Sequence, residues 1–574
     1  APRLRIVASS REALRVAGEA AYAVPPLEMP PAAGAPARPL ESYASVRLFV
    51  ERAAAARAGF CVEPADAAAI GDICRRLDGI PLALELAAAR VRLLSAAAIA
   101  ARLDDRFRLL ASGERAVLPR QQTLRALIDW SHDLLDRDER ALLRRLAVFA
   151  GGFTLEAAEA VASRKPLHAA GILELLARLV EKSLVEHDAG AERYRMLETV
   201  REYGLEKLRE SGEAARVRDA HLHHFTAFAK RAGAELFGAE QAQWLARLDR
   251  ERENLLAAHA WGAREGGDAA AAFEMLGAIK FYWLNRGLLQ LGIGLYARLL
   301  ARPEAQARGT MRQRALYEAG QLRFYASEYR AARACLEESL AIARALDDGE
   351  AIARVLQPLG MSQLGEGDVE AARASLAEAL AAAEGGGNAR NLAAARNALA
   401  QLHRLEGKPQ LAAPLYRSVL AAATELADLE SAAIARLNLA MVSIDAGDLA
   451  DARTHVREAL AAAEELASRT LMQSVLEVCA GLCAAERDWR GAARFFGAAE
   501  GHAQETGLGR DPADAAFLMP RMADARAGLG EAFAAAVDAG RALARKEAAR
   551  EAAALAAGAT LAAPLAASEA TPSS

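Results

Sequence analysis

The chain has 574 residues, more than a single hydrophobic core usually organises, so we expect several domains. Hydrophobic residues make up 53% of it but aromatic residues only 5%, and this excess of small apolar residues is typical of packed helices. The formal net charge of −4 argues against a global positive field for nucleic acid or an anionic membrane. No apolar stretch approaches the roughly 20 residues of a membrane span. Five cysteines, with no visible signal peptide, predict a reducing and cytoplasmic setting.

The first 40 residues contain one buried-strand pattern, Leu4–Ala8, which is followed by Ser9, Ser10 and Arg11. Polar groups at the carboxyl end of a strand lie where α/β sheets bind ligands, although a plain strand end has the same pattern. Prolines concentrated between residues 25 and 39 mark a loop after it. Because the chain starts without Met, in what looks like the middle of a strand, we expect residues 1–40 to be the C-terminal remnant of an α/β domain.

Residues 41–116 are expected to form a small helical domain. Apolar residues at helical spacing cover about 43–57 and 66–77, and Asp66 is predicted to cap the second helix. Gly79 suits the position just after that helix, and Pro81 suits the first turn of the next one. The pattern therefore predicts two helices joined by a tight turn at Gly79.

Residues 117–205 are predicted to form a winged helix. Apolar residues at helical spacing cover two helices between about 124 and 149, and Asp136 with Glu139 forms a capping-box pattern at the start of the second. Two further helices follow, and two short strands then flank a polar turn at 189–191. Helices followed by such a hairpin are typical of the winged-helix fold.

The charges of the candidate recognition helix, at about 171–182, indicate whether this domain contacts DNA or acts within the protein. Its basic residues are Arg178 and Lys182, and Glu174 and Glu181 lie among them. Direct base readout needs Arg, Asn or Gln gathered on one face. We therefore favour an intramolecular relay over DNA contact, and we expect any DNA binding to come from a separate domain absent from this chain.

A repeat with a period of 40 residues follows. Bulky apolar residues recur four positions after a fixed alanine, and Pro409 lies in a helix's first turn, where Pro is tolerated. Small residues at one phase let two helices cross closely, and the alanines are Ala332, Ala372, Ala412, Ala452 and Ala492. The pattern predicts an α-solenoid over 301–510, preceded by a helical bridging region at 206–300 and followed by capping helices at 511–556 and a disordered tail at 557–574.

The concave face of such a solenoid is the expected binding surface for a protein or small-molecule inducer. The first helix of each repeat lines this face, so its polar side chains are candidates, although most of them are expected to be simple solvated positions. The candidates are Arg323, Arg354, Gln363, Asn391, Asn397, Gln401 and Asn438.

Four motifs, in order, resemble the signal-transduction ATPases with numerous domains (STAND proteins), in particular NB-ARC-type bacterial regulators. Val7–Arg11 resembles their sensor-one strand, and Gly79–Ala83 resembles their Gly-Leu-Pro-Leu-Ala motif. The stretch 118–161 is similar to their winged helix, and Met196–Glu198 lies where they often carry Met-His-Asp. The 40-residue repeats resemble the longer variety of tetratricopeptide repeat.

The resemblance implies a fold class and roles for single residues. Residues 1–40 would be the remnant of a P-loop NTPase core, and residues 41–116 would be its helical lid. Arg11 would sense the γ-phosphate of ATP. Pro81 would pack near the adenine, and Gly79 would shape the turn that holds Pro81 there. The fold class is therefore mostly α, with a remnant of an α/β domain, a winged helix and a solenoid.

Elements that this family uses to hold a nucleotide are absent from the sequence. There is no Gly-x-x-x-x-Gly-Lys-Ser/Thr to cradle phosphates, and no apolar strand ending in acidic residues precedes Arg11 to hold Mg²⁺. Leu197 stands where the family has histidine, so no contact with the ADP phosphate is expected there. The resemblance implies that the full-length protein switches between ATP and ADP with Mg²⁺ and associates with itself in a nucleotide-dependent way. This chain alone is not expected to hydrolyse ATP.

The expected function is a signal-transduction regulator, most simply of transcription, whose missing output domain binds DNA or is a nucleotide cyclase. A second class of function stays open, namely a repeat scaffold that binds partner proteins and has no nucleotide role. A hydrolase is the weakest alternative, because Ser131, His132 and Asp133 are neighbours on one helix and cannot form a catalytic triad.

No metal site or catalytic residue is expected. Cys479 and Cys483 lie four apart on a helix, but no further Cys or His joins them at zinc-site spacing, so a small buried pair is favoured. His221, His223 and His224 lack an evident carboxylate or Cys partner, so a solvated helix face is favoured for them.

Overall fold

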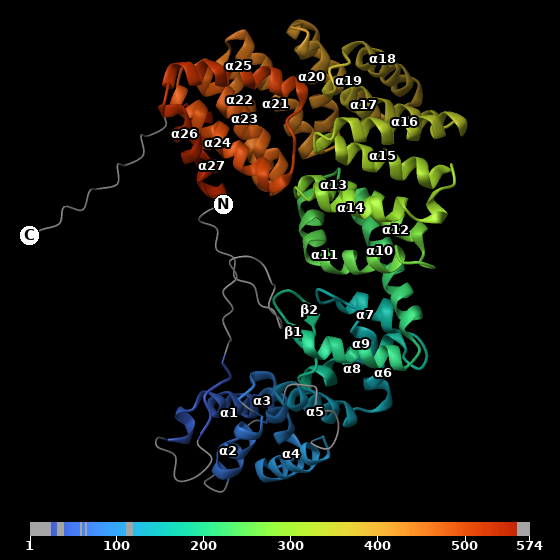
Figure 1. The fold of residues 1–574 in the computed structure, drawn as a ribbon, viewed down its shortest axis with the longest axis vertical. Coiled ribbons are helices and arrows are strands. Elements are labelled where there is room, and N and C mark those ends of the chain that lie inside the picture. The colour runs from blue at the N-terminus through green and yellow to red at the C-terminus, as the bar shows by residue number, and fades with distance from the viewer. Residues whose placement is uncertain are drawn as a thin grey trace, which may run out of the picture. The chain divides into compact units, whose positions relative to one another are not determined.

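The computed structural model describes residues 25–30, 39–57, 60–62, 66–77, 79–110 and 119–558. Within these residues the protein is mostly α-helical, as the sequence predicts, and it forms two compact units divided between Val217 and Arg218 (Figure 1). The strand predicted at Leu4–Ala8, Arg11 after it, and the tail beyond residue 558 lie outside the described residues. None of the described helices is long and apolar enough to cross a lipid bilayer.

The first part of unit 1 is a small helical bundle, in which Val46, Phe49, Ile70 and Ile73 are fully buried. The prediction that Asp66 caps a helix is wrong: Asp66 itself has helical dihedral angles, so its side chain does not turn back onto the first amides and accepts no cap hydrogen bond. The elements are η1 (Leu40–Ser42), α1 (Ala44–Ala56), α2 (Ala67–Arg76), α3 (Pro81–Ala88), η2 (Ala89–Arg92) and α4 (Ala96–Leu110).

The second part of unit 1 contains the winged helix. Asp136 and Glu139 form the predicted capping box, with the Asp136 carboxylate 2.8 Å from the Glu139 amide. Two antiparallel strands form the wing, and Phe153 pairs with Tyr194 at its side. The elements are α5 (Pro119–Asp133), α6 (Arg137–Leu146), α7 (Leu155–Ala162), α8 (Ala169–Glu181), β1 (Glu186–Asp188), β2 (Arg193–Arg195) and α9 (Glu198–Glu210).

A buried arginine holds this domain together. Arg145 of α6 donates to the carbonyl oxygens of Ala162, Arg164 and Lys165 at 2.6 to 3.0 Å. The Glu213 carboxylate lies 2.6 Å from the same guanidinium. A buried cation is tolerated only when its donors are satisfied, so these contacts fix the chain after α7 and after α9 against α6.

A bridging group of helices precedes the repeats, and Trp244 and Trp283 lie in its core. The expectation of a solvated histidine face is wrong for His221, whose side chain is buried and hydrogen-bonds Asn254. Burial lowers the pKa of His221 to about 3, because the protonated ring would lose its hydration. The elements are α10 (Ala214–Glu235), α11 (Gln241–Gly262), α12 (Ala269–Ala278), α13 (Lys280–Asn285), α14 (Leu289–Leu300) and η3 (Pro303–Ala305).

Five helix pairs then repeat every 40 residues. Their second helices all begin at one phase of the repeat, and the predicted alanines, from Ala332 to Ala492, are fully buried within them. The pairs are α15 (Thr310–Tyr325) with α16 (Tyr329–Ala345), α17 (Gly349–Gly365) with α18 (Val369–Gly386), α19 (Ala389–Leu405) with α20 (Pro409–Glu425), α21 (Leu429–Ala446) with α22 (Leu449–Glu465), and α23 (Arg469–Ala485) with α24 (Trp489–Thr506).

Small residues also recur on the first helix of each pair. A Cβ added at Gly320 would lie 2.7 Å from the Leu336 side chain, and one added at Gly360 would lie 2.8 Å from that of Leu376. Alanine takes the same phase in the later pairs, at Ala400, Ala440 and Ala480. Close crossing within each pair therefore depends on small side chains from both helices.

The array curves until its later helices meet the bridging group (Figure 1). α13 lies against α23, and the Asn285 side chain donates to Glu430 at 2.5 Å. The loop after α24 returns to the first pair, where the Gly509 amide donates to the Tyr325 carbonyl at 2.7 Å. The array is thus closed by contacts between residues far apart in sequence. It ends in α25 (Pro512–Leu529), α26 (Ala532–Arg541) and α27 (Arg545–Ala556).

Candidate functional site

Of the three predicted nucleotide-binding residues, Gly79 and Pro81 lie within the described residues and Arg11 does not. Gly79 has a φ of +62°, and a Cβ there would lie 2.3 Å from the Leu27 carbonyl oxygen. Its own carbonyl accepts from the Leu27 amide at 2.9 Å, which holds the segment Pro25–Pro30 against the helical bundle. Pro81 is the first residue of α3 and is exposed. Contact of this turn with a nucleotide stays a prediction.

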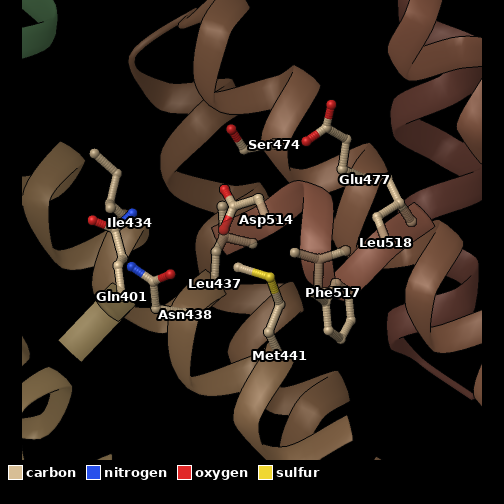
Figure 2. Close-up of a pocket in the computed structure, with 11 residues that line it drawn as sticks. Gln401, Ile434, Leu437, Asn438, Met441, Ser474, Glu477, Asp514, Phe517 and Leu518 are labelled. Carbon is tan, nitrogen blue, oxygen red and sulfur yellow. The ribbon is translucent and has the colours of Figure 1, made fainter. Parts of the chain in front are cut away.

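The closed array contains a cavity on its inner side, which we call the inner cavity. It measures about 200 Å³ and continues into a recess of about 60 Å³. Five residues line both parts: Gln401, Ile434, Ser474, Glu477 and Asp514. Figure 2 shows the recess, with Asp514 of α25 in the middle of side chains from α21 and α23.

A chain of hydrogen bonds runs along the recess from α19 to α25. Asn397 donates to Gln401 at 3.4 Å, and Asn438 donates to Asn397 at 3.1 Å. The buried Arg404 guanidinium donates to Asn438 at 3.4 Å and to Asp514. Because each group is bonded to the next, these side chains hold one another in place along the wall.

Arg510, in the loop before α25, organises a second wall. Its guanidinium donates to Glu477 at 3.1 Å and to Glu500 at 2.9 Å. Its carbonyl oxygen accepts from the Tyr329 hydroxyl at 3.1 Å. The same residue therefore holds the closing loop against the first repeat and positions a carboxylate in the lining.

Carboxyl groups outnumber cations in this cavity. Four line it: Glu430, Glu477, Asp511 and Asp514. Within the described part of the chain, Arg510 is the one Arg or Lys side chain in the lining. Arg510 pairs with Glu477, and Arg404 behind the lining pairs with Asp514. Among the described residues, Glu430 and Asp511 have no ion-pair partner.

Burial shifts the pKa values of Glu430, Glu477 and Asp511. It raises the pKa of Glu430 to about 7, although the hydrogen bond from Asn285 acts in the opposite direction. It likewise raises the pKa of Glu477 to about 7 against the lowering effect of Arg510. The pKa of Asp511 is also raised, by burial and by Asp514. A bound cation would stabilise the ionised forms of these carboxyls and so lower the cost of burying them.

Aromatic side chains line the same cavity, from α13, α15 and the start of α16: Phe281, Phe324, Tyr325 and Tyr329. The Tyr325 hydroxyl has its pKa raised by burial and then by Tyr317, Glu430 and Asp511, so both unpaired carboxyls lie within its electrostatic reach. The inner cavity therefore combines an aromatic wall with an end that attracts cations.

Three of the seven predicted concave-face residues line the inner cavity: Asn397, Gln401 and Asn438. The other four, Arg323, Arg354, Gln363 and Asn391, are not in the lining. The expectation of solvated positions is wrong for Gln363, Gln401 and Asn438, because the packed array buries their side chains. Gln363 accepts a hydrogen bond from Ser375 at 2.8 Å.

The sequence did not predict the acidic residues of the site, nor the residues contributed by the bridging group and by the loop that closes the array. Glu477 carries a usable signal, because it interrupts an apolar run on α23. No such signal marks Asn285, Arg510 or Asp511. These residues come from the bridging group and from the loop that closes the array, and the residues that they contact lie far away in the sequence. Glu430 lies in the first turn of α21, where an acidic residue is ordinary on any helix.

Two family models match parts of the chain. A winged helix-turn-helix domain model matches residues 135–209, and a tetratricopeptide repeat model matches residues 352–425. These matches confirm the winged helix and the repeat solenoid that the sequence predicts.

Two proteins of Mycobacterium tuberculosis are similar over shorter stretches. One is named "Putative HTH-type transcriptional regulator" and is 42% identical over 370 residues, 63% of this chain and 40% of its own length. The other is named as uncharacterized and is 46% identical over 226 residues, 39% of this chain and 54% of its own length. The chain thus spans about half the length of these relatives or less.

A solved STAND protein with a tetratricopeptide repeat sensor, from Pyrococcus horikoshii, aligns with 86% of this chain and 71% of its own, at 14% identity and a TM-score of 0.40. By the two family models, the chain joins a winged helix-turn-helix domain to a tetratricopeptide-repeat array, and 63% of it is similar to a protein named as a transcriptional regulator.

Proposed function

We propose that this chain is the sensing part of a cytoplasmic transcriptional regulator and that the inner cavity binds its signal. The observation that carries the proposal is the closed array, in which an ordered polar lining meets an aromatic wall. A ligand there would contact helices from the bridging group, the repeats and the cap together. Its binding energy would therefore act on how the array closes. The name of one relative supports transcription as the output.

The lining favours a ligand with a positive charge beside an apolar group. Glu430 and Asp511 provide carboxyls that have no ion-pair partner among the described residues, and Tyr325 lies near both. An ammonium or guanidinium group would offset the cost of burying these carboxyls. Phe281 and Phe324 would receive the apolar part. An anionic ligand would instead meet an excess of negative charge.

The winged helix acts as an internal relay in this proposal, not as a reader of DNA. Residues 135–209 contain 13 Arg or Lys and 13 Asp or Glu, so they offer no net attraction for phosphates. On α8, Arg178 lies 3.2 Å from Glu174, and Glu181 pairs with Arg92 of η2 at 3.0 Å. The latter pair joins the candidate recognition helix to the helical bundle. DNA binding by the whole protein would then come from another domain.

The finer proposal is that the full-length regulator switches between ATP and ADP with Mg²⁺, through Arg11, Gly79 and Pro81. The positive φ of Gly79, two residues before α3 begins at Pro81, supports it. Calorimetry with ATP and ADP on this chain, and on the chain extended upstream, tests it. We expect only the extended protein to bind, and Arg11→Ala to weaken ATP more than ADP. If neither protein binds nucleotide, the alternative of a repeat scaffold without a nucleotide role holds.

The inner cavity is tested with two probes of similar shape, phenylethylamine, which is an ammonium, and phenylethanol, which is uncharged. At about pH 8 the carboxyls are ionised, so calorimetry should detect the amine far more strongly than the alcohol. Glu430→Gln and Asp511→Asn should each weaken the amine about tenfold, the loss of one charge-assisted contact. The Asp511 carboxylate caps α25 by accepting from the Ala513 amide at 2.8 Å, and the amide oxygen that Asp511→Asn introduces can accept the same bond.

Glu384→Gln provides the control, because Glu384 is exposed on α18 and outside the lining. This variant should bind the amine as the unchanged protein does. Equal affinity for the amine and the alcohol, or a Glu430→Gln variant that binds the amine normally, would contradict the proposed site.

A further inference from the structure

A second cavity lies elsewhere in unit 2 and shares no lining residue with the inner cavity. It measures about 760 Å³, within the range of pockets for small organic ligands. Its walls come from α11, the turn after α13, the end of α22, the start of α23, α24 and the start of α27. We call it the basic cavity.

Cations dominate the lining of the basic cavity. Six arginine or lysine side chains, Arg252, Arg286, Arg469, Arg545, Lys546 and Arg550, face two carboxylates, Asp249 and Glu464. Arg286 is held by Asp249 at 2.9 Å, and Arg545 pairs with Glu505. Within the described ranges, Arg469, Lys546 and Arg550 have no ion-pair partner. The cavity therefore keeps an uncompensated positive charge.

Three of these six cations lie at the N-termini of helices, where a positive charge is unfavourable. Arg469 is the first residue of α23, and Arg545 and Lys546 are the first two residues of α27. A helix N-terminus carries a partial positive charge, so cations there lower stability and anions raise it. Burial lowers the pKa of Arg469, and the charge of Arg545 lowers it further. An anion between the two helix ends would relieve this repulsion.

We propose that the basic cavity binds a small phosphorylated ligand with at least two negative charges. Arginine forks match phosphate oxygens in pairs, and the N-termini of α23 and α27 favour a negative charge beside them. Leu288 and Met472 provide apolar contact, while no Phe, Tyr or Trp side chain lines the cavity within the described residues. Recognition therefore rests on the phosphate and not on a stacked base. This site goes beyond the proposed function and shares no lining residue with the inner cavity.

Pyrophosphate is the probe, titrated by calorimetry into the full chain at low salt. Arg469→Gln combined with Arg550→Gln should weaken pyrophosphate at least about tenfold, because each arginine forms a charge-assisted contact. Arg417→Gln combined with Arg457→Gln is the control, because it removes the same charge from exposed positions of the repeats outside this lining. The control should bind as the unchanged protein does, and inorganic phosphate should bind more weakly than pyrophosphate.

Three results would overturn the site. The first is no binding of pyrophosphate by the unchanged protein. The second is an equal loss in both double variants, which would reduce the effect to general charge attraction. The third is binding of a polyglutamate peptide where pyrophosphate fails, which would assign the surface to an acidic protein partner. Thermal melting of each variant shows that it is folded.

Discussion

Gly79 joins two segments through a single backbone conformation. Its positive φ and missing side chain allow the Leu27 carbonyl to approach, and no other residue type meets both needs. We expect Gly79→Ala to lower the free energy of unfolding by about 1–3 kcal/mol, from the left-handed backbone and the clash together. Denaturant unfolding measures this change.

Gly171→Ala is the matched control, since Gly171 lies in α8 without a positive φ and a Cβ there meets no atom within 4 Å. Alanine is the better helix former, so this variant should be as stable as the unchanged protein or slightly more so. A Gly79→Ala variant that unfolds like the control would show that the turn is not held as described.

Glu430 and Glu477 make stability depend on pH. Their folded-state pKa values are about 7, against an ordinary value of 4.5. Between these values the folded state binds more protons than the unfolded state, so their contribution to the free energy of unfolding falls as pH rises. We expect the double variant Glu430→Gln with Glu477→Gln to flatten this fall. Its free energy of unfolding at about pH 8 should be higher than that of the unchanged protein by roughly a few kcal/mol. Urea unfolding at about pH 5 and pH 8 measures it, and an unchanged slope would contradict the burial effect.

Single residues were predictable where their partners are close in sequence. The Asp136–Glu139 capping box needs only a spacing of three residues, and the structure has it. His221 was not predictable in the same way, because its burial depends on Asn254 of the next helix. Glu430 shows the limit most clearly, since its partner Asn285 lies 145 residues away.

At the scale of elements, helix crossing in the repeats depends on small side chains. Ala452 of α22 is fully buried, whereas Ala461 of the same helix is exposed. Ala452→Trp should therefore cost at least about 1–3 kcal/mol by forcing α21 and α22 apart, while Ala461→Trp should cost little. Thermal melting compares the two variants, and equal melting temperatures would show that the register of the repeat is wrong.

The 40-residue period predicted where each second helix begins, because the crossing alanines, the turn glycines and the cap residues share that period. Tyr329, Val369, Pro409, Leu449 and Trp489 each begin a helix. The path of the array was not predictable from the same pattern. Curvature accumulates over many small rotations, and it alone decides that the loop after α24 meets α15.

At the scale of the whole molecule, one short segment of unit 2 borders both cavities. Arg286 lines the basic cavity and donates to the Asn285 side chain at 2.8 Å. Asn285 in turn donates to Glu430 of the inner cavity. Arg286 also donates to the Leu466 carbonyl at 2.7 Å, which ties this segment to the end of α22. A ligand in either cavity would therefore act on the contacts that close the array.

The sequence predicted the order of the winged helix and the repeats, since each has its own periodicity and turn residues. It did not predict the inner cavity, which exists only when the first and last helices of the array meet. The proposed nucleotide switch rests on residues of unit 1, whereas both cavities lie in unit 2.

Binding of a cationic signal in the inner cavity should depend on pH, because the carboxyls that would hold it titrate near neutrality. The ammonium of phenylethylamine stays charged from about pH 5.5 to pH 8, while Glu430 and Glu477 ionise across that range. We predict that calorimetry will show affinity rising about tenfold or more with pH, and that Glu430→Gln will remove much of the rise. An affinity that is independent of pH, or that falls as pH rises, would contradict the claim.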